Sequence, residues 1–205
     1  MAGEIQRTGS TNRPRVLYLS HAPEDIYDVV RRMAGDEVDL VLMDSNDDAA
    51  RCAAIADCDA VIVASYRLTG THLAAAKKLQ LVHHQGVGWH DTTDWQTIRD
   101  RDIKLAITLS GSTISVAEHT LMLMLAACRH LSHADAELRK GKWLVNALRT
   151  RSREVMGRTV GIIGMGRIGY QVAERLLPFG TTGLYCDPHV TLDAATEQRL
   201  NMRKT

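Results

Sequence analysis

Three glycines in the last quarter of the sequence have a spacing that can bind a phosphate group. Gly164, Gly166 and Gly169 form a G-x-G-x-x-G motif between the apolar run Thr159–Ile163 and an amphipathic segment, Ile168–Leu177. In such a strand–turn–helix the first glycine permits a tight turn, the second lets the backbone approach a pyrophosphate, and the third allows close packing. The helix N-terminus attracts the phosphates. The residues predicted to bind a dinucleotide cofactor here are Gly164, Met165, Gly166, Arg167, Ile168 and Gly169.

An aspartate at the end of the next predicted strand supports this assignment. Asp187 stands 18 residues after Gly169 and closes the segment Gly183–Asp187. An acid at about this distance can accept hydrogen bonds from the adenosine ribose hydroxyls. Its charge would repel a 2′-phosphate, so the sequence favours NAD over NADP. Two alternatives stay open at this point: a turn that needs glycines only for its geometry, and a methyltransferase-type nucleoside site.

The elements before this motif alternate between short apolar or β-branched runs and helical patterns. The predicted strands are Arg15–Leu19, Val38–Met43, Ala60–Ala64, Leu79–His83 and Ile103–Thr108. The predicted helices between them are Pro23–Met33, Asp47–Ala56, Thr71–Lys78 and Asp94–Arg101. Such alternation implies a parallel sheet with helices on both faces. We therefore predict an α/β fold that begins with a small flavodoxin-like, parallel-sheet domain.

A long apolar segment separates this sheet from the glycine motif. We predict a single helix, Ser115–Ala136, that is apolar on nearly every face between Val116 and Cys128. Such a helix must be buried all round, either between domains or at a subunit interface. The polar, basic stretch Arg139–Arg158 is predicted to cross into a second domain, whose tail is helical from Ala194.

The overall composition excludes several classes of function. Hydrophobic residues make up 45% and aromatic residues 4% of the 205 residues, and the formal net charge is +1. Such a chain offers neither the basic field nor the stacking surface of a nucleic-acid-binding protein. The longest apolar run, 121–128, is too short to span a membrane. The four cysteines form no C-x-x-C pair, so we expect a protein of the reducing cytoplasm. From the charge, the aromatic content and the short apolar runs we expect no nucleic-acid or membrane partner.

Several histidines gather near a glycine-containing loop. His83, His84 and His90 lie close to Asp91 in the sequence, but their spacing matches no regular ligand pattern. We therefore predict no metal site and interpret these residues as strand-end and loop histidines. The adjacent pair in the predicted strand end points to opposite faces.

The motifs together resemble those of D-isomer-specific 2-hydroxyacid dehydrogenases. Three segments carry the resemblance: the cofactor segment Gly157–Gly169, the start of the interdomain helix at Val116–Thr120, and the substrate loop Gly86–Gly88 followed by Asp94. They occur in the family's order and spacing, and the resemblance runs from about residue 15 to 188. It implies a substrate domain followed by the first part of a Rossmann NAD-binding domain.

The resemblance also implies binding residues. The family's substrate carboxylate typically contacts backbone N–H groups of the loop that matches Gly86, Val87 and Gly88, and amides bind anions without a side-chain charge. Ser65 matches a position near the substrate, and Thr113 matches one that can touch the cofactor. The expected small-molecule partner is a 2-hydroxy or 2-keto acid.

Departures from the family pattern limit what can be assigned. Ala64 stands where the family often has arginine, and Ser112 stands where it often has asparagine, so the particular acid is not identified. The family's catalytic arginine, glutamate and histidine lie beyond the position of Thr205. The chain therefore resembles a C-terminally truncated member, and we assign it no catalytic residue. We expect the 205-residue chain alone to be inactive.

These observations lead to one preferred function and two alternatives. The preferred function is an NAD-dependent dehydrogenase that acts on CH–OH donors and forms a homodimer through the apolar helix. The alternatives are a non-catalytic, corepressor-like NAD-binding protein and an inactive truncated product. The predicted domains are a substrate domain at 1–112, an interdomain helix and crossing segment at 113–158, and an incomplete NAD-binding domain at 159–205.

Overall fold

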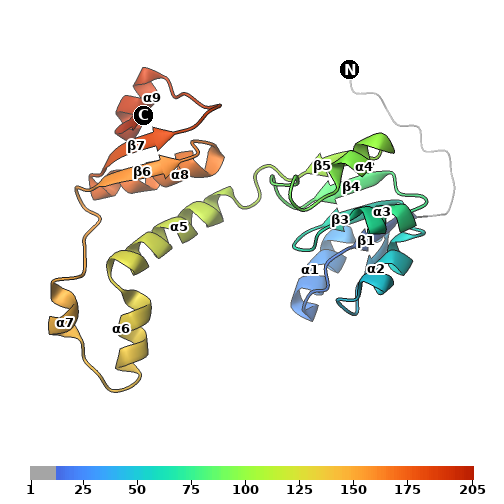
Figure 1. Ribbon diagram of the computed structural model, residues 1–205, viewed down its shortest axis with the longest axis horizontal. Helices are drawn as coiled ribbons and strands as arrows, with labels where there is room; N and C mark the ends of the chain where they lie inside the picture. The colour runs from blue at the N-terminus through green and yellow to red at the C-terminus, as the bar shows by residue number, and fades with distance from the viewer. Residues whose placement is uncertain (1–12) are drawn as a thin grey trace. The chain divides into compact units, whose positions relative to one another are not determined.

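One parallel sheet organises the first unit of the computed structural model, which describes residues 13–205 and divides after Leu109. Its strands are β1 (Arg15–Tyr18), β2 (Asp39–Leu42), β3 (Ala60–Val63), β4 (Leu81–His84) and β5 (Lys104–Ile107). They lie in the order β2-β1-β3-β4-β5, and every neighbouring pair is parallel (Figure 1). This is the flavodoxin-like order, so the predicted α/β class and parallel pairing are confirmed. Residues 1–12, where the predicted first domain begins, lie outside the described residues.

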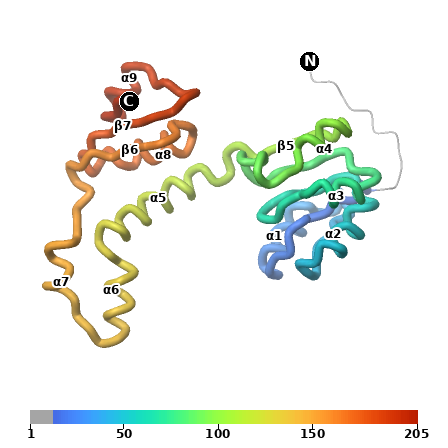
Figure 2. Tube along the Cα trace, in the orientation of Figure 1, coloured from blue at the N-terminus to red at the C-terminus, as the bar shows by residue number. Residues whose placement is uncertain are grey.

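Helices cover both faces of this sheet, as the trace in Figure 2 shows. They are α1 (Glu24–Ala34), α2 (Asp48–Ile55), α3 (Gly70–Ala75) and α4 (Trp95–Asp100). Alternate strand residues such as Val61 and Val82 are fully buried in a core that includes Leu73 of α3. On the opposite face Tyr27 of α1 packs edge-on against Tyr18 of β1, with ring centroids 6.1 Å apart. Because all five strands are parallel, their carboxyl ends lie at the same edge of the sheet.

A second parallel sheet organises residues 110–205. Strands β6 (Thr159–Ile163), β7 (Thr182–Cys186) and β8 (Met202–Lys204) lie in the order β6-β7-β8. The helices are α5 (Thr113–Cys128), α6 (Leu131–Leu138), α7 (Val145–Arg149), α8 (Arg167–Leu176) and α9 (Ala194–Leu200), with a 3₁₀ turn η1 (Leu177–Phe179). Helix α5 packs on α8 through a core that contains Ala117, Val172 and Leu176. The helix predicted to lie between domains therefore packs against the second sheet's own helix.

The prediction of one continuous helix over Ser115–Ala136 is wrong. The chain breaks between α5 and α6, and His130 adopts a left-handed conformation with φ of 52°. The carbonyl of Cys128 accepts a hydrogen bond from the backbone N–H of Arg153 at 2.8 Å. The crossing segment thus returns to the end of α5 and satisfies a carbonyl that a longer helix would have used.

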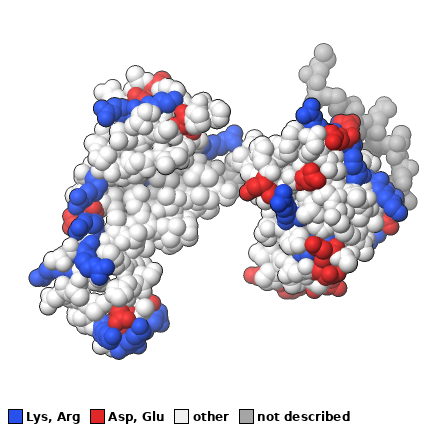
Figure 3. All heavy atoms as spheres, in the orientation of Figure 1, with Lys and Arg blue, Asp and Glu red and all other residues white. Residues whose placement is uncertain are grey.

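Helix α5 has one buried and one exposed side. Ala117 is fully buried, whereas Met122 and Leu123 are 52% and 53% exposed in the single chain. Glu118 is the one acidic or basic (Asp, Glu, Lys, Arg) residue of the helix, and the space-filling view of Figure 3 shows a largely uncharged surface in this part of the unit. Cover of this side by a second subunit stays a prediction.

Candidate functional site

The glycine turn joins β6 to the N-terminus of α8. Gly164 has a φ of +93°, which side chains other than glycine's rarely tolerate. Gly166 caps the helix, and a Cβ built there meets no heavy atom within 4 Å. A Cβ built at Gly169 would lie 2.1 Å from the carbonyl oxygen of Gly164. The turn thus has a corner that glycine adopts without strain, an open position and a tight helix contact, which is the arrangement that its sequence predicted.

The other residues of the turn divide between anchoring and exposure. Met165 is 2% exposed and packs in a core with Ala173 and Tyr185. Arg167 and Ile168 form the first turn of α8, where Ile168 is 40% exposed. Because the first N–H groups of a helix have no partner within the helix, this turn can donate to a phosphate group.

Asp187 ties the end of β7 to the glycine turn. Its Oδ2 accepts from the backbone N–H of Met165 at 2.7 Å, and its Oδ1 accepts from those of His189 and Val190 at 2.8 Å. The amides of His189 and Val190, and then that of Met165, hold the pKa of the carboxyl below its ordinary value. Asp187 is therefore an ionised acceptor that also fixes the turn, a structural role that the sequence alone did not reveal.

The proposed substrate residues lie at the carboxyl ends of β3 and β4. Ser65 follows β3 and is exposed. The Oγ of Ser20, 3% exposed at the end of β1, accepts from the backbone N–H groups of Ser65 and Tyr66, both at 3.2 Å. Ser20 was missed by the sequence analysis, although a serine that directly follows a predicted strand was a usable signal.

The loop after β4 presents unpaired backbone donors. Within residues 13–205, the N–H groups of Gly86, Val87 and Gly88 have no hydrogen-bond acceptor. A Cβ at Gly88 would meet nothing within 4 Å, so the backbone there is open to a ligand. Consecutive N–H groups without acceptors can bind an anion, so this geometry fits the substrate role that the resemblance implied.

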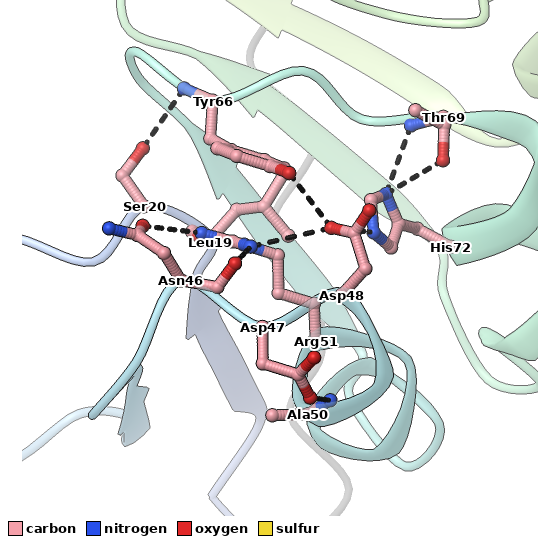
Figure 4. Close-up of polar contacts among 10 residues, drawn as sticks. All are labelled: Leu19, Ser20, Asn46, Asp47, Asp48, Ala50, Arg51, Tyr66, Thr69 and His72. Atoms are coloured by element: carbon pink, nitrogen blue, oxygen red, sulfur yellow. Dashed lines mark hydrogen bonds and ion pairs between the residues drawn. The ribbon is translucent and has the colours of Figure 1, made fainter.

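A buried arginine braces the loop that carries Ser65 (Figure 4). Arg51 is fully buried; its guanidinium donates to Leu19 O at 3.1 Å and to Asn46 O at 2.8 Å. The same group stacks on the Tyr66 ring, 3.4 Å from its centroid. Tyr66 in turn donates to Asp48 at 2.8 Å, and this hydrogen bond lowers the pKa of the Asp48 carboxyl. These contacts hold the β3–α3 loop against the sheet edge.

The remaining predicted positions are less constrained. Thr113 is the first residue of α5, and its contact with a cofactor stays a prediction.

His83 and His84 point to opposite faces of β4. The part of the chain that the structure describes has no group of three or more His, Cys, Asp or Glu side chains that could hold a metal ion. No helix among the described residues is long and apolar enough to cross a membrane.

The fold and the glycine turn define an α/β protein with a dinucleotide-binding type of second unit, and comparison with known proteins agrees. Residues 121–205 match the family described as "D-isomer specific 2-hydroxyacid dehydrogenase, NAD binding domain". The chain is 37% identical to D-3-phosphoglycerate dehydrogenase of Mycobacterium tuberculosis over 158 residues. It is 38% identical to hydroxypyruvate reductase of Thermotoga maritima over 135 residues. By the family match, residues 121–205 belong to the NAD-binding domain of the D-isomer specific 2-hydroxyacid dehydrogenase family.

The chain covers only part of these relatives. The match with the mycobacterial enzyme spans 77% of this chain and 29% of that protein, and the match with the Thermotoga enzyme spans 65% and 43%. A structure of NAD-dependent formate dehydrogenase from Staphylococcus aureus in complex with NAD has the same fold, with a TM-score of 0.78 at 24% identity. That likeness covers 94% of this chain and 60% of the solved one.

Proposed function

We propose that the protein takes part in an NAD-dependent dehydrogenase reaction, in which a hydride passes between the cofactor and C2 of a 2-hydroxy or 2-keto acid. The observation that carries this proposal is the open glycine turn at the start of α8, held in place by the ionised Asp187. NAD supplies the hydride-accepting chemistry when it is bound. The family match of residues 121–205 supports the reaction type.

The chain's own residues supply binding and orientation in this proposal. The open backbone at Gly166 and the first N–H groups of α8 receive the pyrophosphate. A carboxylate offers about four acceptor sites, and three of those of Asp187 are occupied by backbone N–H groups. Asp187 uses the remaining site, on Oδ2, for an adenosine ribose hydroxyl. The amides of Gly86 to Gly88, with Ser65, receive the substrate carboxylate. We assign proton transfer to no residue of this chain.

Asp187 provides the test of cofactor choice. We expect calorimetric titration to show tighter binding of NAD than of NADP. Asp187→Ala should weaken NAD binding by about tenfold to a hundredfold, the range for losing a hydrogen bond to a charged group. It should also bring the affinities for NAD and NADP closer together, because the carboxylate charge that repels the 2′-phosphate of NADP is gone.

Asp187→Asn is the matched control for this titration, since it keeps an acceptor oxygen and removes the charge. We expect it to bind NAD better than Asp187→Ala does and to share the narrowed ratio. In the folded chain the pKa of the Asp187 carboxyl lies below its ordinary value of 3.8. The stability that the ionised carboxylate gives to the fold is therefore present above that value, and it is lost as the pH falls through the lower folded pKa. NAD affinity should therefore be equal at pH 7 and pH 5. An unchanged NAD/NADP ratio in both variants would count against the ribose role.

We further propose a homodimer that uses the exposed side of α5. Met122 and Leu123 are more than half exposed in the single chain, and contiguous apolar surface of this kind marks an association site. Leu123→Arg should weaken self-association at least about tenfold in sedimentation equilibrium, because it places a charge in the apolar contact. Gln198→Arg, an exposed position on α9, is the control and should associate like the wild type. A wild-type chain that stays monomeric at high concentration would refute the dimer.

All four cysteines, Cys52, Cys58, Cys128 and Cys186, are free. Free thiols are typical of proteins in a reducing compartment, and they support the proposal that the protein acts in the cytoplasm.

A further inference from the structure

His84 is a buried imidazole without a hydrogen-bond partner. It is the last residue of β4 and is 6% exposed. Neither Nδ1 nor Nε2 has a partner among the described residues, although both atoms are buried. The adjacent His83, on the opposite face of the strand, places its Nε2 3.1 Å from the Thr108 hydroxyl. The missing partner is therefore a property of one face of β4 at its carboxyl end.

The ring of His84 lies against the first glycine of the substrate loop. A Cβ built at Gly86 would be 3.2 Å from Cε1 and 3.4 Å from Nδ1 of this ring, whereas one built at Gly88 would meet nothing within 4 Å. Gly86 thus leaves room for the imidazole edge to reach the loop. This contact gives Gly86 a reason to be glycine that is separate from anion binding.

Two independent features therefore meet at one place. The N–H groups of Gly86, Val87 and Gly88 have no acceptor within the described chain, and the imidazole beside them has no partner. Native proteins leave few buried polar atoms unpaired, and those left unpaired often mark a site for a ligand, ion or water. The carboxyl edge of a parallel sheet is also where α/β proteins bind ligands.

We propose that His84 is a ligand-binding residue of this loop and donates a ring N–H to an oxygen of a small 2-oxo carboxylate. The backbone amides are donors only, so they select an anion with several acceptor oxygens. The imidazole adds one directional donor from the buried side of the loop. This inference rests on the proposed function for the location of the substrate, and it adds a side-chain contact that the resemblance does not assign.

The test is binding of pyruvate and of its stable analogue oxamate to the full chain labelled with ¹⁵N-histidine. We expect the ring nitrogen signals of His84 to shift on titration while those of His83 stay in place. We expect His84→Leu to weaken binding by about tenfold or more, as for a lost hydrogen bond to a charged group. His84→Gln keeps a side-chain N–H donor and should retain most of the affinity. His83→Leu is the matched control and should bind like the wild type.

Thermal melting separates a binding role from a packing role. Because His84→Leu replaces an unpaired buried polar group by an apolar one, we expect its melting temperature to equal or exceed that of the wild type. If His84→Leu fails to fold, the ring signals and the His84→Gln variant still decide the matter. Ring signals that do not move at saturation, or equal affinities of wild type and His84→Leu, overturn the inference and leave the proposed function standing. A wild type that binds neither probe overturns both the inference and the substrate part of the proposed function.

Discussion

The Gly166→Val variant is expected to lose NAD binding below the limit of detection while it stays folded. A Cβ at this position points into open space, with no heavy atom within 4 Å, so the side chain meets nothing in the free protein. The backbone of Gly166 is extended, with φ of −73° and ψ of −166°, which valine adopts readily. The branched side chain instead fills the space that a pyrophosphate needs in order to reach the N–H groups of α8.

The stability of this variant is part of the prediction. Valine is a poorer helix N-cap than glycine by up to about 1 kcal/mol, so the melting temperature should fall by no more than about 8 °C. Gly161→Ala in β6 is the matched control, because a Cβ there also meets nothing within 4 Å and Gly161 is outside the turn. We expect it to bind NAD like the wild type in the same calorimetric titration. NAD affinity that survives in Gly166→Val would refute the assignment of the phosphate site.

Much of the fold could be predicted because local pattern and tertiary packing agree. The strands and helices of the first unit follow apolar runs that the core then buries. The break after Cys128 could not be predicted, because it depends on the N–H of Arg153, 25 residues further along, reaching that helix end. Strand β8 was missed since it is short and carries Arg203 and Lys204. Helix α7 lies in a basic stretch without a clear apolar period.

The same division applies to the site. The spacing of Gly164, Gly166 and Gly169 was sufficient to predict three different local geometries, because each depends on contacts within one strand–turn–helix. The hydrogen bond from Met165 to Asp187 spans 22 residues and exists only after β6 and β7 have paired. The support of Ser65 by Ser20 spans 45 residues and needs β1 and β3 side by side. Sequence reasoning therefore found the residues that form the glycine turn and missed the residues that hold the turn and the Ser65 loop in place.

Replacing Gly169 even with alanine is expected to have the largest effect of any single substitution in the second unit. In an ordinary helix this change stabilises by about 1 kcal/mol, because alanine is the better helix former. Here the added Cβ would lie 2.1 Å from the backbone oxygen of Gly164 and 3.2 Å from Cγ2 of Ile162. The Gly164 carbonyl cannot move aside without disturbing the glycine turn. Helix α8 cannot move aside without losing its packing on β6. We therefore expect Gly169→Ala to destabilise the protein instead, with a loss of about 3 kcal/mol or more of unfolding free energy. We expect it to lose NAD binding as well.

Gly183→Ala is the informative comparison, since it also creates a close contact. A Cβ at Gly183 would lie 1.7 Å from Sδ of Met202, but that atom belongs to an unbranched, adaptable side chain that can take another rotamer. In denaturant titrations followed by circular dichroism, Gly169→Ala should therefore lose at least twice as much unfolding free energy as Gly183→Ala. Only Gly169→Ala should lose its response to NAD. Equal losses in the two variants would mean that α8 can slide on β6, and that the third glycine of the motif does not set the distance between the helix N-terminus and the phosphate site.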